Sequence, residues 1–149
     1  MLYIGSDHAG FNLKQALKKF LTREKYNFED LGNLKLDEKD DYPDFGARVA
    51  QGVATNPKKN KGILICGSGQ GMAIVANKFL GVRAAVVCDE DGAKKSREHN
   101  DANILAISGN ISESKIKKIV KAWLQSKFSG GRHSKRLKKI MQIEKDNFK

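Results

Sequence analysis

The chain has 149 residues, of which 40% are hydrophobic and 30% charged, and this suits one domain with a single hydrophobic core. It has no run of about 18 apolar residues, so we expect no membrane-spanning helix, and its first residues lack the pattern of a secretory signal. The two cysteines, Cys66 and Cys88, are too few for a disulfide framework and fit the reducing cytoplasm.

The net charge of +11 is concentrated in the last quarter of the chain. Residues 111–149 hold 12 Lys and Arg against 3 Asp and Glu, whereas residues 1–110 hold 16 against 14. Basic charge attracts anions, whether a nucleic acid or a small phosphate ester, so charge alone does not identify the partner. A solvated helix face explains most of these lysines without any partner.

Short apolar runs alternate along the chain with segments of helical periodicity. Residues 2–6 predict a strand, and Leu13, Leu17 and Leu21 belong to a helical apolar pattern that predicts an amphipathic helix over 11–25. The runs at 62–66 and 82–88 are continuous, which is typical of strands buried on both faces. Further strands are expected at 26–31 and 103–108, and further helices at 41–54, 72–79, 91–98, 111–128 and 132–144.

Five strands alternating with helices predict an α/β fold, a three-layer sandwich with a five-stranded parallel sheet, in one domain spanning 1–149. In such sheets the binding crevice lies beyond the carboxyl ends of the strands. Polar residues gather after the first and third predicted strands, at Asp7-His8 and in the turn from Cys66 to Gly71. We therefore expect the functional site at this edge.

Cys66 ends an apolar strand and precedes a turn with three glycines in five residues. The partial positive charge of a helix N-terminus favours a thiolate, and glycine N–H groups converge on an anion without Cβ hindrance. A base beside such a nest is what enolate chemistry requires, but a packing cysteine before a tight turn explains the pattern equally well. The Gly-x-Gly-x-Gly spacing matches neither the dinucleotide fingerprint nor the P-loop, which argues against NAD and ATP.

Three other polar features are candidates for function. Asp7 would cap the helix that follows it or, with His8, face the crevice. His99 ends a predicted helix, where a partly exposed polar residue is the simpler explanation. Arg132 and Arg136 share one face of the last predicted helix and suit bidentate phosphate binding, with a solvated basic face as the alternative.

The remaining residues of interest have structural explanations. Cys88 lies late in an apolar strand and Trp123 lies on an apolar helix face, so both are expected in the core. Tyr42 is either a loop anchor or a hydroxyl donor to a sugar. The spacing of the histidines, His8, His99 and His133, fits no zinc pattern, so we expect no metal.

Several of these segments, in this order, resemble the type B ribose-5-phosphate isomerases, a branch of the ribose/galactose isomerases. The resemblance covers nearly the whole chain. It implies a Rossmann-like sandwich, no metal or other cofactor, and homodimers or homotetramers with active sites at the subunit interface. The matching segments are Asp7-His8-Ala9-Gly10, Asp41-Tyr42-Pro43, Cys66-Gly67-Ser68-Gly69, Ala76-Asn77-Lys78, His99-Asn100-Asp101 and Gly130-Gly131-Arg132-His133.

The resemblance implies catalytic roles for three residues. Cys66 would move a proton between C2 and C1 of the open-chain sugar, and Ser68 would support its thiolate. His99, together with Asn100, would open the furanose ring, a task suited to imidazole because it titrates near neutral pH. The enediolate oxygen would be bound by backbone N–H groups of Gly67, Gly69 and Gly71.

The resemblance also implies the binding residues. Asp7 and Tyr42 would hold sugar hydroxyls, and the phosphate would be held by His8, Arg132 and Arg136. This chain departs from the pattern at two positions. Met72 stands where one branch of the family has a glutamate base, which leaves the role to Cys66, and Asn110 stands where many relatives have a phosphate-binding arginine.

The resemblance therefore implies an aldose–ketose isomerase that interconverts ribose 5-phosphate and ribulose 5-phosphate in the cytoplasm. An isomerase of the same fold acting on allose 6-phosphate or galactose 6-phosphate is the nearest alternative. A basic nucleic-acid-binding module is a remote one, because the chain lacks the sequence patterns of such modules and has only 7% aromatic residues for stacking on bases. We expect no specific nucleic-acid partner and no membrane partner.

Overall fold

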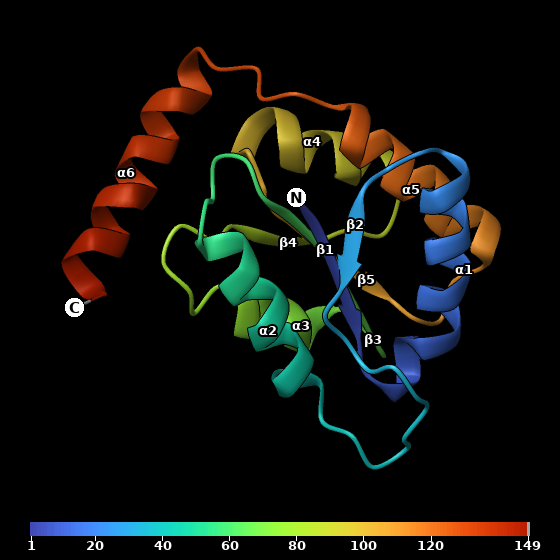
Figure 1. The fold of residues 1–149 in the computed structure, drawn as a ribbon. Helices are drawn as coiled ribbons and strands as arrows, with labels where there is room; N and C mark the ends of the chain where they lie inside the picture. Colours follow the sequence, from blue (N-terminus) through green and yellow to red (C-terminus); the bar gives the residue numbers. More distant parts are fainter. Residues whose placement is uncertain (149) are drawn as a thin grey trace.

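Five parallel strands form one sheet in the order β2-β1-β3-β5-β4 (Figure 1). The structure is a computed structural model that describes residues 1–148. The register pairs Ser6 with Ile65 and Cys66 with Ser108, so the central strands end side by side at one edge of the sheet. The strands are β1 (Leu2–Ser6), β2 (Phe28–Asp30), β3 (Lys61–Cys66), β4 (Ala84–Val86) and β5 (Ile104–Ser108).

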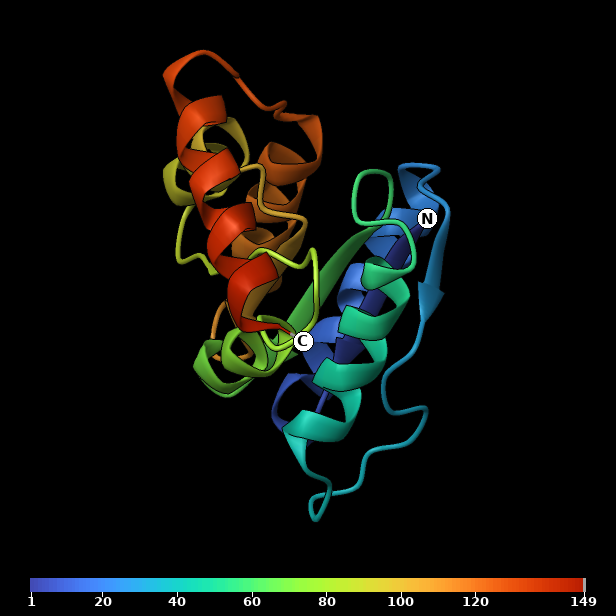
Figure 2. The same ribbon diagram turned by 90° about the vertical axis from the view of Figure 1, so that its left-hand side faces the viewer.

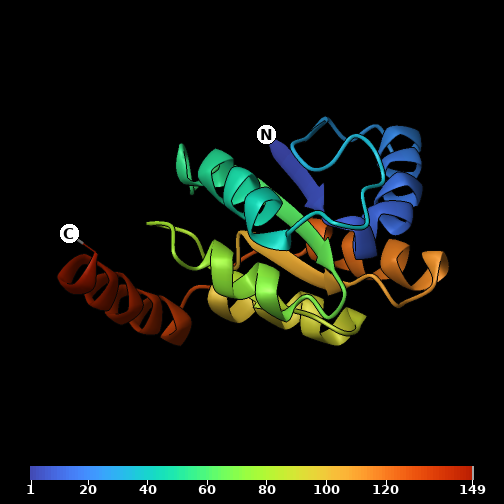
Figure 3. The same ribbon diagram turned by 90° about the horizontal axis from the view of Figure 1, so that it is seen from below.

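Helices cover both faces of the sheet, as Figure 3 shows from below. Along β3, Ile63 and Ile65 pack in one apolar cluster with α1, α4 and α5, whereas Leu64 and Cys66 pack in the other with α2 and α3. Alternate side chains of a strand point to opposite faces, so one continuous apolar run supplies both clusters. The helices are η1 (His8–Gly10), α1 (Phe11–Arg23), α2 (Tyr42–Ala54), α3 (Gln70–Ala76), α4 (Glu90–Asn100), α5 (Glu113–Gln125) and α6 (Arg132–Asn147).

Helix α6 lies apart from the sandwich. Figure 2 shows it on the outside of the molecule, and only His133 and Leu137 along it are buried. Ile140, Met141 and Ile143 are 46%, 55% and 62% exposed. Ile140 and Ile143 line a cavity that Val82 and Ala84, near β4, also line. Within residues 1–148, no helix combines the length and the apolar character that crossing a membrane requires.

The predicted α/β fold is confirmed, and so is the order of its strands and α-helices, while several ends differ and the short η1 was not predicted. Helix α5 is shorter than the predicted 111–128 because Ser112 caps it, its side chain accepting a hydrogen bond from the Lys115 N–H. Trp123 is fully buried, as expected. The expectation that Cys88 packs in the core is wrong: β4 ends at Val86, and Cys88 is exposed in the connection to α4.

Candidate active site

The Cys66 thiol lies at the carboxyl edge of the sheet, at the end of a central strand. It is only 4% exposed, and its Sγ accepts a hydrogen bond from the Gly69 N–H at 3.2 Å. Hydrogen bonds of a backbone N–H are strongest when the acceptor is charged. A cysteine that only packs in the core needs no such hydrogen bond, so this geometry favours Cys66 as a base.

The glycine turn is held in a conformation that a side chain at position 69 would disturb. Gly69 has φ +79°, and a Cβ there would lie 3.1 Å from the backbone of Ile107 in the neighbouring strand. In contrast, a Cβ at Gly67 would meet nothing within 4 Å, so the turn is open on that side. The turn therefore packs tightly against β5 at one residue and leaves space for a ligand at another.

Two residues at the end of β5 fix the peptide that follows Cys66. The Gly67 carbonyl accepts hydrogen bonds from Ser108 Oγ at 2.7 Å and from Asn110 Nδ2 at 3.2 Å. The Cys66 carbonyl accepts one from the Gly109 N–H at 2.7 Å. Asn110, which stands where many relatives have arginine, thus helps to orient the turn. The sequence did not predict this structural role of Asn110.

Ser68 and Gly71 have contacts that the sequence did not indicate. Ser68 Oγ accepts a hydrogen bond from the Gln70 N–H at 3.3 Å, so the hydroxyl is engaged at the start of α3, whereas the donor to the thiol is Gly69. Gly71 lies under the ring of Tyr42, where a Cβ would come within 2.6 Å of two ring atoms. A glycine is needed here so that the tyrosine lies against α3, next to the thiol turn.

The segment after β1 brings an aspartate and a histidine to the same edge. Asp7 is buried, and its Oδ1 accepts a hydrogen bond from the Gly10 N–H at 3.2 Å, which confirms its capping role. His8 is half-buried and pairs with Asp40: its Nδ1 lies 2.7 Å from Asp40 Oδ1. The hydrogen bond that the His8 ring donates to Asp40 raises the pKa of His8 above its ordinary value, burial opposes the rise, and the charge of Asp7 adds to it.

Asp40 is a residue that sequence reasoning missed. It lies in the polar loop 31–41, whose composition gives no sign of which side chain turns inward. Burial by itself would raise the pKa of Asp40, but hydrogen bonds from the backbone and ring of His8 and from the Asn33 amide lower it below the ordinary value. Asp7, His8 and Asp40 each offer one possible metal-ligating atom within 4.8 Å of the others, but their side chains already form the hydrogen bonds described, and we assign no metal to them.

The other predicted site residues gather at the opposite edge of the sheet. Helix α4 runs back from the carboxyl end of β4, so His99 and Asn100 lie near the start of β5, and the Asn100 carbonyl accepts a hydrogen bond from Arg83 Nε. Arg132 and Arg136 are exposed on the first turns of α6, close to this end of α4. Strand β3 spans about 17 Å between the edges, so one chain does not bring these residues to Cys66.

His133 joins the second group, although the sequence gave it no role. Its ring stacks on His99 with centroids 4.4 Å apart and an interplanar angle of 12°. Burial lowers the pKa of His133, and the neighbouring His99, Arg132 and Arg136 lower it further. The stacking contact with His133 fixes the orientation of the His99 ring. In the sequence, the one signal for a role of His133 is that it directly follows Arg132, a predicted phosphate ligand.

Comparisons with known proteins identify the family and the fold of the chain. The family model described as Ribose/Galactose Isomerase matches residues 2–140. A protein of Mycoplasma genitalium named "Probable ribose-5-phosphate isomerase B" is 43% identical over 146 residues, covering 97% of this chain and 96% of its own. The crystal structure of ribose-5-phosphate isomerase B from Mycoplasma genitalium with bound ribulose-5-phosphate superposes with a TM-score of 0.95, at 43% identity, over 98% of this chain and 97% of that one. The D-erythrulose-4-phosphate isomerase of Pectobacterium atrosepticum is 34% identical over 142 residues, 95% of this chain and 93% of its own.

Proposed function

Since the chain belongs to the ribose/galactose isomerase family, we propose that it interconverts ribose 5-phosphate and ribulose 5-phosphate through an enediolate. The observation that carries the proposal is the Gly69 N–H directed at the Cys66 sulfur, at the edge where parallel sheets bind their ligands. The similarity over nearly the full chain to ribose-5-phosphate isomerase B, solved with bound ribulose-5-phosphate, supports this substrate over other anions.

Cys66 is the base of this mechanism. Its thiolate takes the proton from C2 of the open-chain aldose, the electron pair forms the C1–C2 double bond, and the former carbonyl oxygen O1 becomes negatively charged. The thiol then returns the proton to C1, O2 loses its own proton, and the carbonyl forms at C2 while O1 is protonated. Backbone N–H groups of Gly67 and Gly71 stabilise the enediolate oxygen, whereas the N–H of Gly69, predicted to do the same, is directed at the Cys66 sulfur, and Ser68 supports the turn.

Substrate binding uses groups from both edges of the sheet. Asp7 and Tyr42 hold sugar hydroxyls beside Cys66, and His8 holds the phosphate at the same edge. Ring opening by His99 with Asn100 and phosphate binding by Arg132 and Arg136 need residues about 17 Å away in the same chain. A second copy of the chain supplies them, so the working unit is a homodimer or a larger homo-oligomer.

The projecting α6 supports this assembly. Its exposed apolar residues, Ile140, Met141 and Ile143, would be covered by a partner subunit, and the same docking would carry Arg132 and Arg136 to the partner's Cys66 edge. The chemistry uses only side chains and backbone groups of the protein, so we expect activity without added metal and in the presence of a chelator. The thiols of Cys66 and Cys88 are unpaired, which supports a reducing compartment such as the cytoplasm.

Turnover of ribose 5-phosphate, compared with allose 6-phosphate, galactose 6-phosphate and D-erythrulose 4-phosphate, tests the substrate. We expect the pentose phosphate to have the highest kcat/KM, and a higher value for any of the others would overturn the assignment. Cys66→Ala should lower kcat by several orders of magnitude, while Cys88→Ala, at an exposed position outside the site, should retain it. Wild-type turnover by Cys66→Ala would remove the thiol from the mechanism.

A mixing experiment tests the shared site. Cys66→Ala and His99→Asn should each be nearly inactive, but a hybrid dimer of the two has one site in which both residues are intact. After exchange of subunits we expect roughly a quarter of wild-type activity, because half of the dimers are hybrids and each has one working site of two. No recovery, with subunit exchange verified by mass spectrometry, would place the whole site in one chain.

A further inference from the structure

We propose that Asp40 is a positioning residue for phosphate binding: it holds the His8 ring through Nδ1, so that Nε2 meets the phosphate of the substrate as a charged donor. Asn33 in turn holds Asp40. This proposal rests on the proposed function, since it takes the ligand of His8 to be the phosphate group of the sugar. It gives a functional role to the loop 31–41, which the sequence predicts only as a connection.

The pairing of His8 with Asp40 fixes both the tautomer and the ring. Asp40 Oδ1 accepts two hydrogen bonds from the same residue, one from the His8 backbone N–H at 2.9 Å and one from its Nδ1 at 2.7 Å. An ionised carboxylate only accepts, so the proton of this bond is on Nδ1. Nε2 is then the ring atom that meets a ligand, and it donates to a phosphate oxygen only when the ring is charged.

Asp40 is held from behind by a buried network. Its Oδ2 accepts a hydrogen bond from Asn33 Nδ2 at 3.1 Å, and Asn33 Oδ1 accepts one from Ser6 Oγ at 3.0 Å. The Asn33 carbonyl accepts from Lys14 Nζ, which is fully buried and also donates to both oxygens of Asp30 at 3.0 Å. The loop is therefore tied to β1, α1 and β2 through one asparagine, and Asp40 has little freedom to leave His8.

The charges around His8 favour its protonated form. The charged groups that face the ring are Asp7, on its own turn, and Asp40, on the loop packed against it; both raise the pKa of His8. Lys14 lies behind Asn33, where its own pair with Asp30 balances its charge. Because phosphate esters are mainly dianions above about pH 6 to 7, a histidine that stays charged in that range binds them better than a neutral one.

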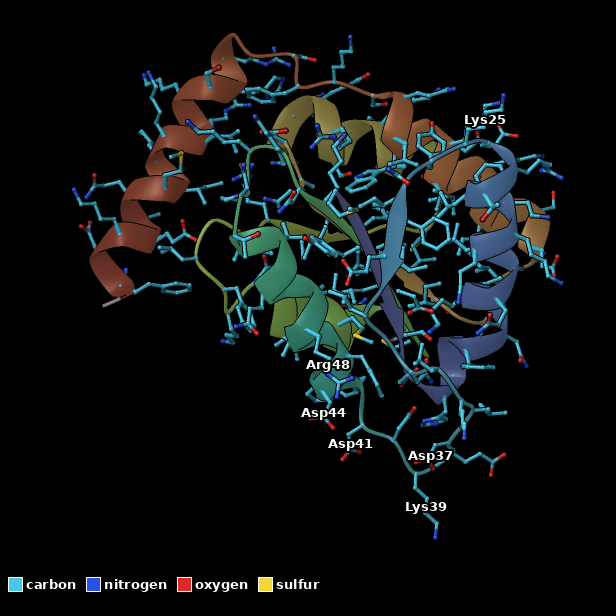
Figure 4. All side chains as sticks on the ribbon, in the orientation of Figure 1. Lys25, Asp37, Lys39, Asp41, Asp44 and Arg48 are labelled. Atoms are coloured by element: carbon cyan, nitrogen blue, oxygen red, sulfur yellow. The ribbon has the colours of Figure 1, made fainter. Side chains whose placement is uncertain are left out.

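The substitution Asp40→Asn tests the charge while keeping an acceptor of the same shape. Asp41→Asn is the matched control, because it makes the same change one residue away on an exposed side chain; Figure 4 shows Asp41 at the solvent side of the loop. Near neutral pH we expect Asp40→Asn to raise KM for ribose 5-phosphate roughly tenfold, as for the loss of one charge-assisted hydrogen bond, with kcat nearly unchanged. The inhibition constant of inorganic phosphate should rise by the same factor, and both effects should shrink as the pH is lowered, because protonation then charges the ring in both proteins. Asp41→Asn should leave KM and the inhibition constant unchanged.

A double-mutant cycle separates this role from a general loosening of the loop. If Asp40 acts through His8, Asp40→Asn adds no further increase of KM once His8→Gln is present. The ring titration of His8, followed by NMR on the full chain, should move to lower pH in Asp40→Asn and not in Asp41→Asn. Additive losses in the double variant, a fall in kcat with KM unchanged, or an unmoved titration each overturn the proposal.

The same NMR measurement distinguishes failure of this proposal from failure of the proposed function. If the wild-type protein does not isomerise ribose 5-phosphate, the assignment of the substrate fails. Titration with inorganic phosphate still reports on His8: its ring signals should shift on binding, and the apparent dissociation constant should rise in Asp40→Asn. An equal dissociation constant in the two proteins rules out the positioning role.

Discussion

The substitution Gly69→Ala perturbs the turn that carries the proposed base, and the structure allows its effect to be worked out. Gly69 has φ +79°, which costs about 1–2 kcal/mol for a residue with a Cβ. The added Cβ would also lie 3.1 Å from the backbone of Ile107 in a central strand that cannot move aside cheaply, and overpacking of this kind costs about 1–3 kcal/mol. We therefore expect Gly69→Ala to destabilise the protein by about 2–5 kcal/mol.

Gly130→Ala is the matched control. Gly130 also has a positive φ, +68°, but a Cβ there would meet only Ser134 Oγ, at an ordinary distance of 3.7 Å. Gly130→Ala should therefore lower the free energy of unfolding only by the cost of a positive φ, about 1–2 kcal/mol. Denaturant unfolding at one fixed protein concentration measures the difference between the two variants. Equal destabilisation would show that the contact with β5 does not constrain the turn.

The same variant has a chemical readout. The Gly69 N–H donates to Cys66 Sγ, so a shifted turn weakens stabilisation of the thiolate. Iodoacetamide should alkylate Cys66 more slowly in Gly69→Ala than in the parent, and substrate should protect the parent. The experiment requires a Cys88→Ser background because the exposed Cys88 would otherwise react first. Unchanged alkylation of Cys66 at neutral pH would refute the link between the glycine turn and the base.

Three further predictions concern stability and binding. Lys14→Met removes the buried lysine from Asp30, which keeps Lys18 as a partner, and should cost about 1–3 kcal/mol, whereas Lys18→Met, whose side chain is 31% exposed, should cost about 1 kcal/mol or less, both measured by urea unfolding. Gly71→Ala would push its Cβ against Tyr42 and should raise KM with little loss of stability, because the tyrosine is partly exposed and moves; an unchanged KM would remove Tyr42 from the binding site. Arg136→Ala should raise KM about 10- to 100-fold at both low and high ionic strength, since a direct phosphate contact resists screening, and a loss that disappears with salt would indicate only a general field.

The helices and strands were predictable because nearly all of them depend on local pattern. The continuous run of β3 and the helical spacing of Leu13, Leu17 and Leu21 each predict the element that forms. The ends were less predictable, because capping residues decide them: the Ser112 cap makes α5 begin later in the chain than its apolar pattern predicts. Cys88 was misjudged because an apolar residue two positions beyond a strand looks like part of it.

The parts of the site that sequence reasoning missed depend on contacts between distant segments. His8 and Asp40 are 32 residues apart, and no local pattern marks which aspartate of a polar loop turns inward. Lys14 lies on a helix whose lysines are expected in solvent, but its ammonium is buried against Asp30 and the Asn33 carbonyl. Charged residues are misjudged most easily where they pair, because pairing is what allows their burial.

The separation of the two halves of the site follows from the topology of a parallel sheet. Each helix returns the chain to the amino edge before the next strand begins, so a residue at the end of a helix, such as His99, lies opposite a residue at the end of a strand, such as Cys66. On the proposed function, a single chain of this fold therefore does not join its strand-end base to the helix-end residues. The exposed apolar residues of α6 support the proposed assembly on independent grounds. In that assembly, association completes the site as well as covering apolar surface, so a variant that weakens association should lose kcat/KM as the protein is diluted.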